Sequence, residues 1–419
     1  MGSVVDAVQG PASQTEIAKP KSEDPATRPP VPDANHLFAN NVRFLSMVAI
    51  IALHTIGIYS FLHHQEKPLT LLAAEQVMKF GSIAFFLVAG FLFGERVDHY
   101  NPLQYYGRRL KNVFLPWTVW YLTYSALCFA HRFRHPGSAS DWIALTREAL
   151  SVSLQSTPYW FVPNLLIALA LLLMLRPILR DGRVGLVLMT MSLFYAVNIY
   201  GRWLPVEHHR AVFGFVFYLW LGAWCSWHSA DVEKCLARVG MVVLFVLLAA
   251  TYVLGVAETK LLLSAQSADP MNTLRISNQL YSVVAVLALF RLRRALWPRF
   301  VSVREHTFGL YLTHSVALPV FAFALRKFLP YLGWARFWDG PAGATLLILA
   351  TFVAVYGSCL LLVRGLLSCR WTRWTVGLAG SRPGAAHVQP PLQKASFGRP
   401  ASPGLPVRTD KLATVVGSN

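Results

Sequence analysis

An uncharged apolar run over residues 44–62 constrains this chain more than any other stretch. A helix of about 20 mainly apolar residues crosses the hydrocarbon core of a bilayer, and this run has that length. One ionisable side chain, His54, lies near its middle. An ionisable group at that depth is costly in lipid and usually faces a protein interior or a water-filled cavity. The run therefore predicts a transmembrane helix with a polar inner face.

Nine further apolar stretches follow, so ten transmembrane helices are expected. They lie near 80–93, 113–130, 158–175, 184–200, 211–227, 239–256, 274–290, 307–325 and 342–363. Hydrophobic residues make up 55% of the 419 residues and charged residues only 14%, which is typical of polytopic membrane proteins. The sequence thus predicts an all-α, polytopic transmembrane helical bundle. A polar loop is expected over 63–79, and a short surface helix over 142–154.

Three segments differ in composition. Residues 1–36 and 366–419 are expected to be cytoplasmic tails, largely disordered because Pro, Ser and Gly are frequent, with a basic juxtamembrane piece at the start of the second. Residues 37–365 are expected to form the membrane domain. Most of the 38 Lys and Arg residues lie in the tails and in the loops on their side, so the positive-inside rule places both termini in the cytoplasm.

Several function classes are disfavoured by composition. The net charge of +18 does not indicate nucleic-acid binding, because the basic residues separate apolar spans instead of forming a dense patch. The five cysteines show neither CxxC spacing nor pairing with nearby histidines, so neither a disulfide framework nor a metal site is expected.

Arg43 and His54 are expected to share one helix face. They are eleven residues apart, which is about three turns and about 16 Å along the axis. A cation at the membrane edge and an imidazole near the midplane suggest an anionic ligand at the edge and proton transfer within the span. The alternative is that His54 only packs against a neighbouring helix and bonds to a backbone carbonyl.

Further candidates lie at two depths. Arg108, Arg109 and Lys111 are predicted at the cytoplasmic membrane edge, where guanidinium groups suit phosphate, although they could serve only as topology anchors. His314 is predicted at a depth similar to that of His54. Trp160 is interpreted as an interfacial anchor, and Gly90 as a point where another helix approaches closely.

Five motifs in this order resemble acyltransferase family 3. The pair Arg43 and His54 is similar to the opening helix of that family. The other four stretches are 85–92, 108–112 with Pro116 and Trp117, 159–161, and 309–314, and the resemblance covers roughly residues 37–365. Members are ten-helix bacterial membrane enzymes that O-acylate cell-surface glycans and antibiotics.

This chain departs from the family pattern at four positions. Asn40 stands where an acidic residue is common, Phe44 where a small one is preferred, and Ala89 where serine is usual. Asn112 occupies the place of the second arginine in an RxxR pattern, which weakens the donor-site assignment unless Lys111 compensates.

The resemblance implies a reaction and a place in the cell. An acyl group, expected to be acetyl, would pass from a cytoplasmic coenzyme A thioester to a hydroxyl of a carbohydrate or glycolipid acceptor, in the bacterial inner membrane. His54 would act as general base, with Arg43 and His314 as further catalytic candidates. Arg43, Arg108, Arg109 and Lys111 would bind the acyl-CoA donor. Membrane lipids are the other expected partner; no metal cofactor and no nucleic-acid partner are expected.

Three other hypotheses about the function remain open. The acyl group could pass through a covalent intermediate to the outer face. A transporter or flippase for lipid-linked sugars could use His54 and His314 as a proton relay, although no repeat symmetry or pair of broken helices supports it. A scaffold that binds anionic lipids through its basic loops is the third.

Overall fold

Every predicted span is a helix in the computed structural model, which describes residues 34–63, 68–134, 142–328, 331 and 340–378. The expected disordered tails lie almost wholly outside these residues. The ten helices that match the predicted spans are α1 (Ala34–His63), α3 (Gly81–Gly94), α5 (Leu115–Arg134), α7 (Phe161–Met174), α8 (Gly182–Gly201), α9 (Val212–Trp227), α11 (Met241–Ser264), α12 (Ile276–Arg291), α13 (Val303–Phe328) and α15 (Pro341–Ser368).

Shorter helical elements connect these ten. They are α2 (Leu69–Met78), α4 (Pro102–Arg109), the π-helical turn η2 (Leu110–Phe114), α6 (Trp142–Gln155), α10 (Ser229–Arg238), and the 3₁₀ turns η3 (Pro158–Trp160), η4 (Arg176–Ile178), η5 (His208–Arg210) and η7 (Arg373–Val376). The surface helix predicted over 142–154 is confirmed as α6. Side-chain caps explain where two helices start. Asn101 accepts from the Leu103 N–H before α4, and Asp181 accepts from the Arg183 N–H before α8.

Among the described residues, seven helical stretches are each long and apolar enough to cross a membrane. An eighth passes this test only as a pair, α6 with η3 and α7, which is bent by 77°. The remaining two, α9 and α12, are apolar but shorter. The prediction of a polytopic transmembrane helical bundle is therefore confirmed.

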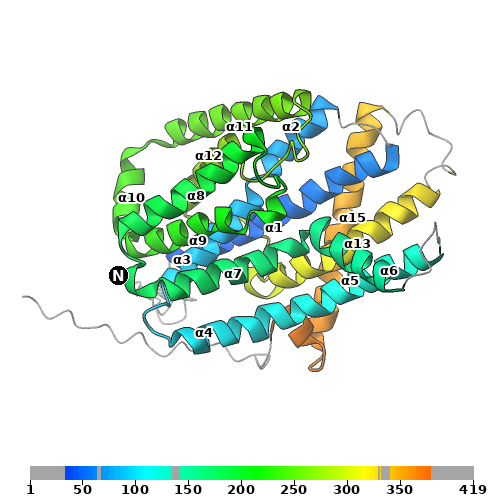
Figure 1. Ribbon diagram of the computed structural model, residues 1–419, viewed down its shortest axis with the longest axis horizontal. Helices are drawn as coiled ribbons and strands as arrows, with labels where there is room; N and C mark the ends of the chain where they lie inside the picture. Colours follow the sequence, from blue (N-terminus) through cyan, green and yellow to red (C-terminus); the bar gives the residue numbers. More distant parts are fainter. Residues whose placement is uncertain (1–33, 64–67, 135–141, 329–330, 332–339, 379–419) are drawn as a thin grey trace, which may run out of the picture. The chain divides into compact units, whose positions relative to one another are not determined.

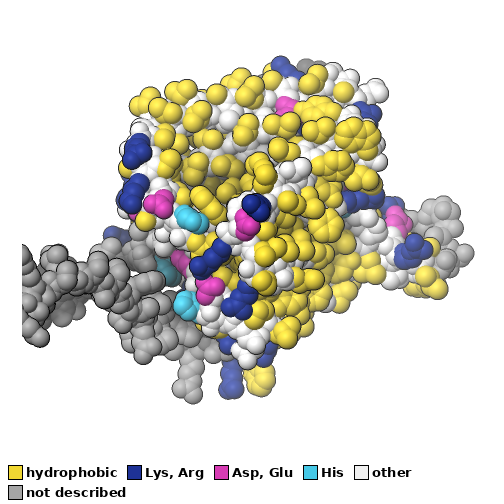
Figure 2. Space-filling view, turned by 60° about the vertical axis from the view of Figure 1, so that its left-hand side comes forward, with side chains coloured by type: hydrophobic (Ala, Val, Ile, Leu, Met, Phe, Trp, Pro, Cys, Tyr) yellow, Lys and Arg dark blue, Asp and Glu magenta, His cyan; other side chains and the backbone are white. Residues whose placement is uncertain are grey.

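The outer faces of the bundle are apolar. Side chains on α11 such as Val242, Phe245 and Val253 are 75%, 60% and 61% exposed. A surface this apolar is costly in water and is expected of helices that face lipid. Figure 2 shows hydrophobic side chains over much of the visible face, with charged side chains gathered in patches.

Figure 1 shows how the helices of the bundle are arranged, and two large hydrophobic cores lie between them. The first is built mainly from α3, α7 and α9, and the second from α1, α13 and α15 with parts of α5 and α7. Helix α1 joins the two, because it packs against both α3 and α13. Residues on the inner face of α1 are therefore surrounded by protein.

Helices α3 and α9 approach each other backbone to backbone. A Cβ atom built on Gly90 would lie 1.9 Å from the Leu219 carbonyl oxygen, and one built on Gly222 would lie 2.0 Å from the Leu87 oxygen. Small residues allow such contacts between membrane helices, because dispersion between closely packed backbones replaces the hydrophobic drive that lipid removes. The predicted close approach at Gly90 is confirmed.

The prediction of a polar loop over 63–79 is wrong for most of that range. Residues 69–78 form helix α2, which leads into α3 as part of one candidate span, Leu69–Gly94. Its polar residues suggested a loop because polar groups usually face water. In the structure Gln76 is fully buried, accepts a hydrogen bond from the Arg275 guanidinium at 2.6 Å and donates one to Asn278 Oδ1 at 3.2 Å. Partners inside the bundle therefore allow these residues to lie within a span.

Candidate functional site

His54 and His314 meet inside the bundle. The first lies on α1 and the second on α13, two helices that pack together, and their ring centroids are 5.8 Å apart. His314 is fully buried and His54 is partly buried. The sequence predicted similar depths for these residues, and the structure brings their rings together.

The contacts of His314 distinguish its two ring nitrogens. Its Nδ1 lies 3.1 Å from the Leu310 carbonyl oxygen, which can only accept, so this nitrogen carries the proton in that hydrogen bond. In the neutral ring Nε2 then keeps a lone pair. Nε2 is buried and has no hydrogen-bond partner among the described residues. A buried acceptor without a partner is costly, so this one is a candidate for contact with a substrate or a water.

Aromatic side chains from the motif of His314 itself and from two other motifs hold the segment around His314. The Tyr311 hydroxyl donates to the Pro158 carbonyl at 2.5 Å, and the Tyr159 hydroxyl donates back to the Leu312 carbonyl at 2.9 Å. The Trp117 indole N–H donates to the Tyr159 carbonyl at 2.9 Å. These three bonds join α13, η3 and α5, so they fix the backbone that presents His314. Sequence reasoning did not assign this role to them.

A cluster of cations surrounds Arg43 near the start of α1. Arg96, Arg109 and Arg304 lie within electrostatic range of Arg43, as does Glu95. They come from the region after α3, the end of α4 and the start of α13, so these segments lie close to Arg43 on α1. We call Arg43, Arg96, Arg109 and Arg304 the arginine cluster. Sequence reasoning missed Arg96 and Arg304, although Arg96 follows one predicted span and Arg304 precedes another.

The three basic candidates of the α4 region differ in their surroundings. Arg109 belongs to the arginine cluster and donates to the Tyr105 hydroxyl at 2.9 Å. Arg108 is exposed, with its guanidinium 4.9 Å from the centre of the Tyr100 ring. Lys111 is exposed in the π-helical turn η2. Single π turns often occur at functional sites. Of these three, only Arg109 has an electrostatic interaction with Arg43 within the described part of the chain.

The interpretation of Trp160 as an interfacial anchor is wrong. This side chain is buried, and its ring lies 5.4 Å from that of Phe215 and 5.0 Å from that of His208. Trp160 lies in η3, at the 77° bend between α6 and α7, and packs against partners from distant parts of the chain instead of facing the membrane surface. Over the residues that the structure describes, no three His, Cys, Asp or Glu side chains gather in a way that could hold a metal ion.

Residues of three motifs, 116–117, 159–161 and 309–314, thus meet around His314. A comparison of the whole chain decides the family. The sequence pattern of acyltransferase family 3, described as an acyltransferase domain, matches residues 36–363. The chain belongs to acyltransferase family 3. No curated protein and no solved structure matches it.

The geometry also bears on one departure from the family 3 pattern. Asn112 is neutral where the family has a second arginine, and exposed Lys111 was considered as its replacement. The cations around Arg43 are instead Arg96, Arg109 and Arg304. Positive charge in this family 3 chain is therefore concentrated around Arg43 without an arginine at position 112.

Proposed function

We propose that this family 3 acyltransferase moves an acyl group, acetyl in the simplest case, from a coenzyme A thioester to a hydroxyl of a cell-surface or exported carbohydrate. The observation that carries the proposal is the paired rings of His54 and His314, 5.8 Å apart inside the bundle. An imidazole can accept and return a proton near neutral pH, which acyl transfer to a hydroxyl requires.

The arginine cluster supports a coenzyme A donor. Coenzyme A carries a diphosphate and a ribose phosphate, and planar guanidinium groups bind phosphate oxygens in pairs. Arg43 and His54 are eleven residues apart on α1, or about 16 Å along its axis. An extended pantetheine arm spans a distance of that order, so phosphates at the arginine cluster would leave the thioester near the two histidines.

In the proposed mechanism His54 is the general base. It removes the proton of the acceptor hydroxyl as the hydroxyl oxygen attacks the thioester carbonyl carbon. Collapse of the tetrahedral intermediate breaks the carbon–sulfur bond, and the thiolate takes the proton back from the His54 imidazolium. The products are an ester and free coenzyme A. His314, whose ring centroid lies 5.8 Å from that of His54, is a positioning residue, and its Nε2 lone pair would favour the imidazolium that forms.

We place the protein in the bacterial inner membrane with both termini in the cytoplasm. The arginine cluster is then at the cytoplasmic edge, where coenzyme A thioesters are made. A carbohydrate or glycolipid acceptor would enter from the other end of the bundle, directly or after an acyl relay. The distribution of Lys and Arg supports this orientation.

Mass spectrometry of surface carbohydrates tests the proposed function. Cells that carry the gene should show carbohydrate hydroxyls esterified by one acyl group, and cells that lack it should lose this mass increment. Restoring the wild-type gene should restore the ester, and restoring a His54→Gln version should not. Identical carbohydrate masses with and without the gene would contradict the proposed acceptor class.

A further inference from the structure

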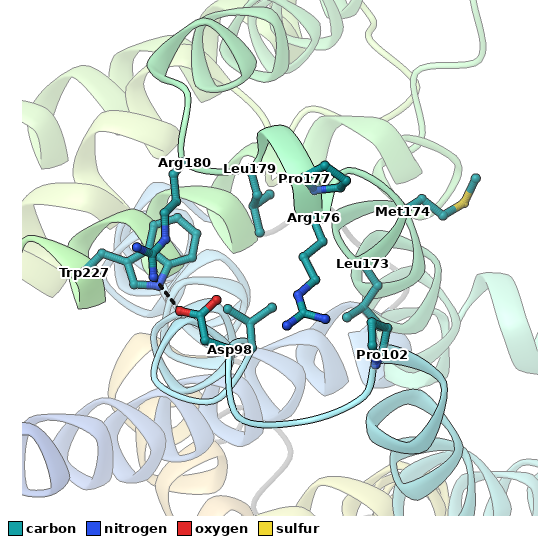
Figure 3. A pocket seen from close by; sticks show the side chains of 10 residues that line it. Asp98, Pro102, Leu173, Met174, Arg176, Pro177, Leu179, Arg180 and Trp227 are labelled. Carbon is teal, nitrogen blue, oxygen red and sulfur yellow. Dashed lines mark hydrogen bonds and ion pairs between the residues drawn. The ribbon is translucent and has the colours of Figure 1, made fainter. Parts of the chain in front are cut away.

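A pocket of about 530 Å³ opens at the end of the bundle where α1 begins. Its walls come from the segment after α3, the start of α4, the end of α7 with η4, and the end of α9. The pocket shares no residue with the histidine pair or the arginine cluster. Figure 3 shows its lining, with side chains of Arg176, Arg180, Asp98, Leu173 and Trp227 around the opening.

The two arginines of the pocket have different partners. Arg180 pairs with Asp98, and its guanidinium lies 5.2 Å from the centre of the Trp227 ring. Arg176 is directed into the pocket (Figure 3), and its guanidinium makes no hydrogen bond or ion pair within the described residues. With one carboxylate against two guanidinium groups, the lining has a net positive charge. A planar, unpaired guanidinium in a positive pocket is suited to an oxyanion such as phosphate.

The rest of the lining is apolar and lies beside an exposed apolar surface. Val97, Leu173, Met174 and Leu179 contribute to the walls. Met174 is 79% exposed, and neighbouring Ile178 is 53% exposed. A positive pocket with an apolar rim, at the level where transmembrane helices end, matches a phospholipid, whose charged headgroup adjoins its acyl chains.

We propose that this pocket binds the phosphate headgroup of an anionic membrane phospholipid. Arg176 contacts a phosphate oxygen, Arg180 adds positive charge from the wall, and the lipid chains leave over Met174 and the apolar end of α7. The site would anchor η4 between α7 and α8 to the membrane. It does not depend on the chemistry at His54, so the proposed function can fail without affecting it.

Lipid retention measured by native mass spectrometry tests the proposal. The full-length protein is released from nanodiscs of phosphatidylcholine with a minor share of phosphatidylglycerol. Wild type should retain phosphatidylglycerol, and Arg176→Gln should retain about tenfold less, because losing a charge-assisted hydrogen bond costs on the order of one factor of ten in affinity. Arg183→Gln is the matched control, since Arg183 is an exposed arginine seven residues away that does not line the pocket.

A second variant and a competition complete the test. Met174→Glu, at an exposed position, should also reduce retention by repelling the headgroup, while thermal unfolding stays unchanged. Inorganic phosphate and coenzyme A should not displace phosphatidylglycerol from the wild type. Equal retention by wild type, Arg176→Gln and Met174→Glu would overturn the proposal. Displacement by either soluble phosphate compound would also overturn it, because the pocket would then bind a soluble ligand.

Discussion

His314 has one ring nitrogen in a hydrogen bond and one without a partner. Nδ1 is 3.1 Å from the Leu310 carbonyl oxygen, and Nε2 has no partner among the described residues. A histidine that only packed would be expected to have both nitrogens bonded or one in water. Its position 5.8 Å from the His54 ring therefore favours a part in the reaction.

Substitutions at His314 should separate positioning from packing. His314→Gln keeps an acceptor atom in the same space, whereas His314→Leu removes it. We expect His314→Leu to lower kcat at least tenfold with little change in donor KM. His314→Gln should keep most of the wild-type kcat. Steady-state kinetics with thioester donor and acceptor measure this. Equal kcat values for the two variants would show that the lone pair has no role.

Arg109 should contribute to donor binding more than Arg108 does, because only Arg109 lies in the arginine cluster. Arg109→Ala is expected to raise the donor KM about tenfold or more without altering acceptor KM, and Arg109→Lys to restore it only in part, since an ammonium lacks the bidentate fork. Arg108→Ala is the matched control. The wild-type donor KM should also rise with salt.

If Arg109 only fixed the orientation of the helices in the membrane, its substitutions would give different kinetics. Lysine would then replace Arg109 fully, and donor KM would not depend on either position. Unchanged donor KM in Arg109→Ala at low and high salt would remove the donor site from this end of the bundle.

Individual residues show how far the sequence could predict the site. The depth of His54 and His314 follows from their places in apolar runs, so both could be found without a structure. Their pairing could not, because α1 and α13 are brought together only by the packing of the bundle. Arg96 and Arg304 were missed for the same reason. Tyr159 and Tyr311 gave no signal beyond belonging to motifs.

At the scale of helices, the contact between α3 and α9 depends on glycine. Gly90→Ala should destabilise the protein by about 1–3 kcal/mol, because the new methyl group would overlap the backbone of Leu219 and the helices would have to separate. Gly57→Ala on α1 is the control, since a Cβ there meets nothing within 4 Å. Thermal unfolding in detergent compares the two. Equal melting temperatures would contradict the close packing.

A pair of ionisable groups joins two connecting segments. One is η5, between α8 and α9, and the other is 265–275, between α11 and α12. His208 Nδ1 lies 2.6 Å from Asp269 Oδ2, and the Asn272 amide donates to the same oxygen at 3.1 Å. Burial raises the pKa of Asp269, but the hydrogen bond and charge of His208, with a smaller effect of Lys79, outweigh burial and lower it to about 2.

A pKa of about 2 instead of the usual 3.8 makes the folded state more stable when Asp269 is ionised. The contribution, about 2 kcal/mol, is fully present above pH 4 and is lost as the pH falls towards 2. Asp269→Asn should therefore lower the melting temperature at pH 7, and the difference from wild type should shrink between pH 4 and 2. A constant difference across this range would show that the carboxylate charge is not responsible.

The helices themselves were largely predictable, and the exceptions have one cause. Each of the ten apolar runs is a helix, because length and lack of charge suffice for a transmembrane segment. Helix α2 and the inward position of Trp160 were not predictable, since both depend on partners from distant parts of the chain. Gln76 meets Arg275, and Trp160 meets Phe215.

At the scale of the whole molecule, the bundle separates charge from the reacting groups. The arginine cluster lies at the end where α1 begins, and the histidine pair lies about three turns further along α1. The proposed reaction needs this order, because a donor bound by its phosphates at one end must place its thioester in the buried interior.

Cleavage of the donor by the purified protein is the most direct test of the proposed reaction at His54. Wild-type protein in lipid vesicles receives acetyl coenzyme A without acceptor, and free thiol is measured over time. We predict slow release of coenzyme A by the wild type, and a rate lower by about 10²–10⁴-fold in His54→Gln, because glutamine keeps a polar side chain but cannot take a proton. Thiol release that is absent from the wild type, or equal in wild type and a folded His54→Gln variant, would contradict the proposed role of His54 as general base.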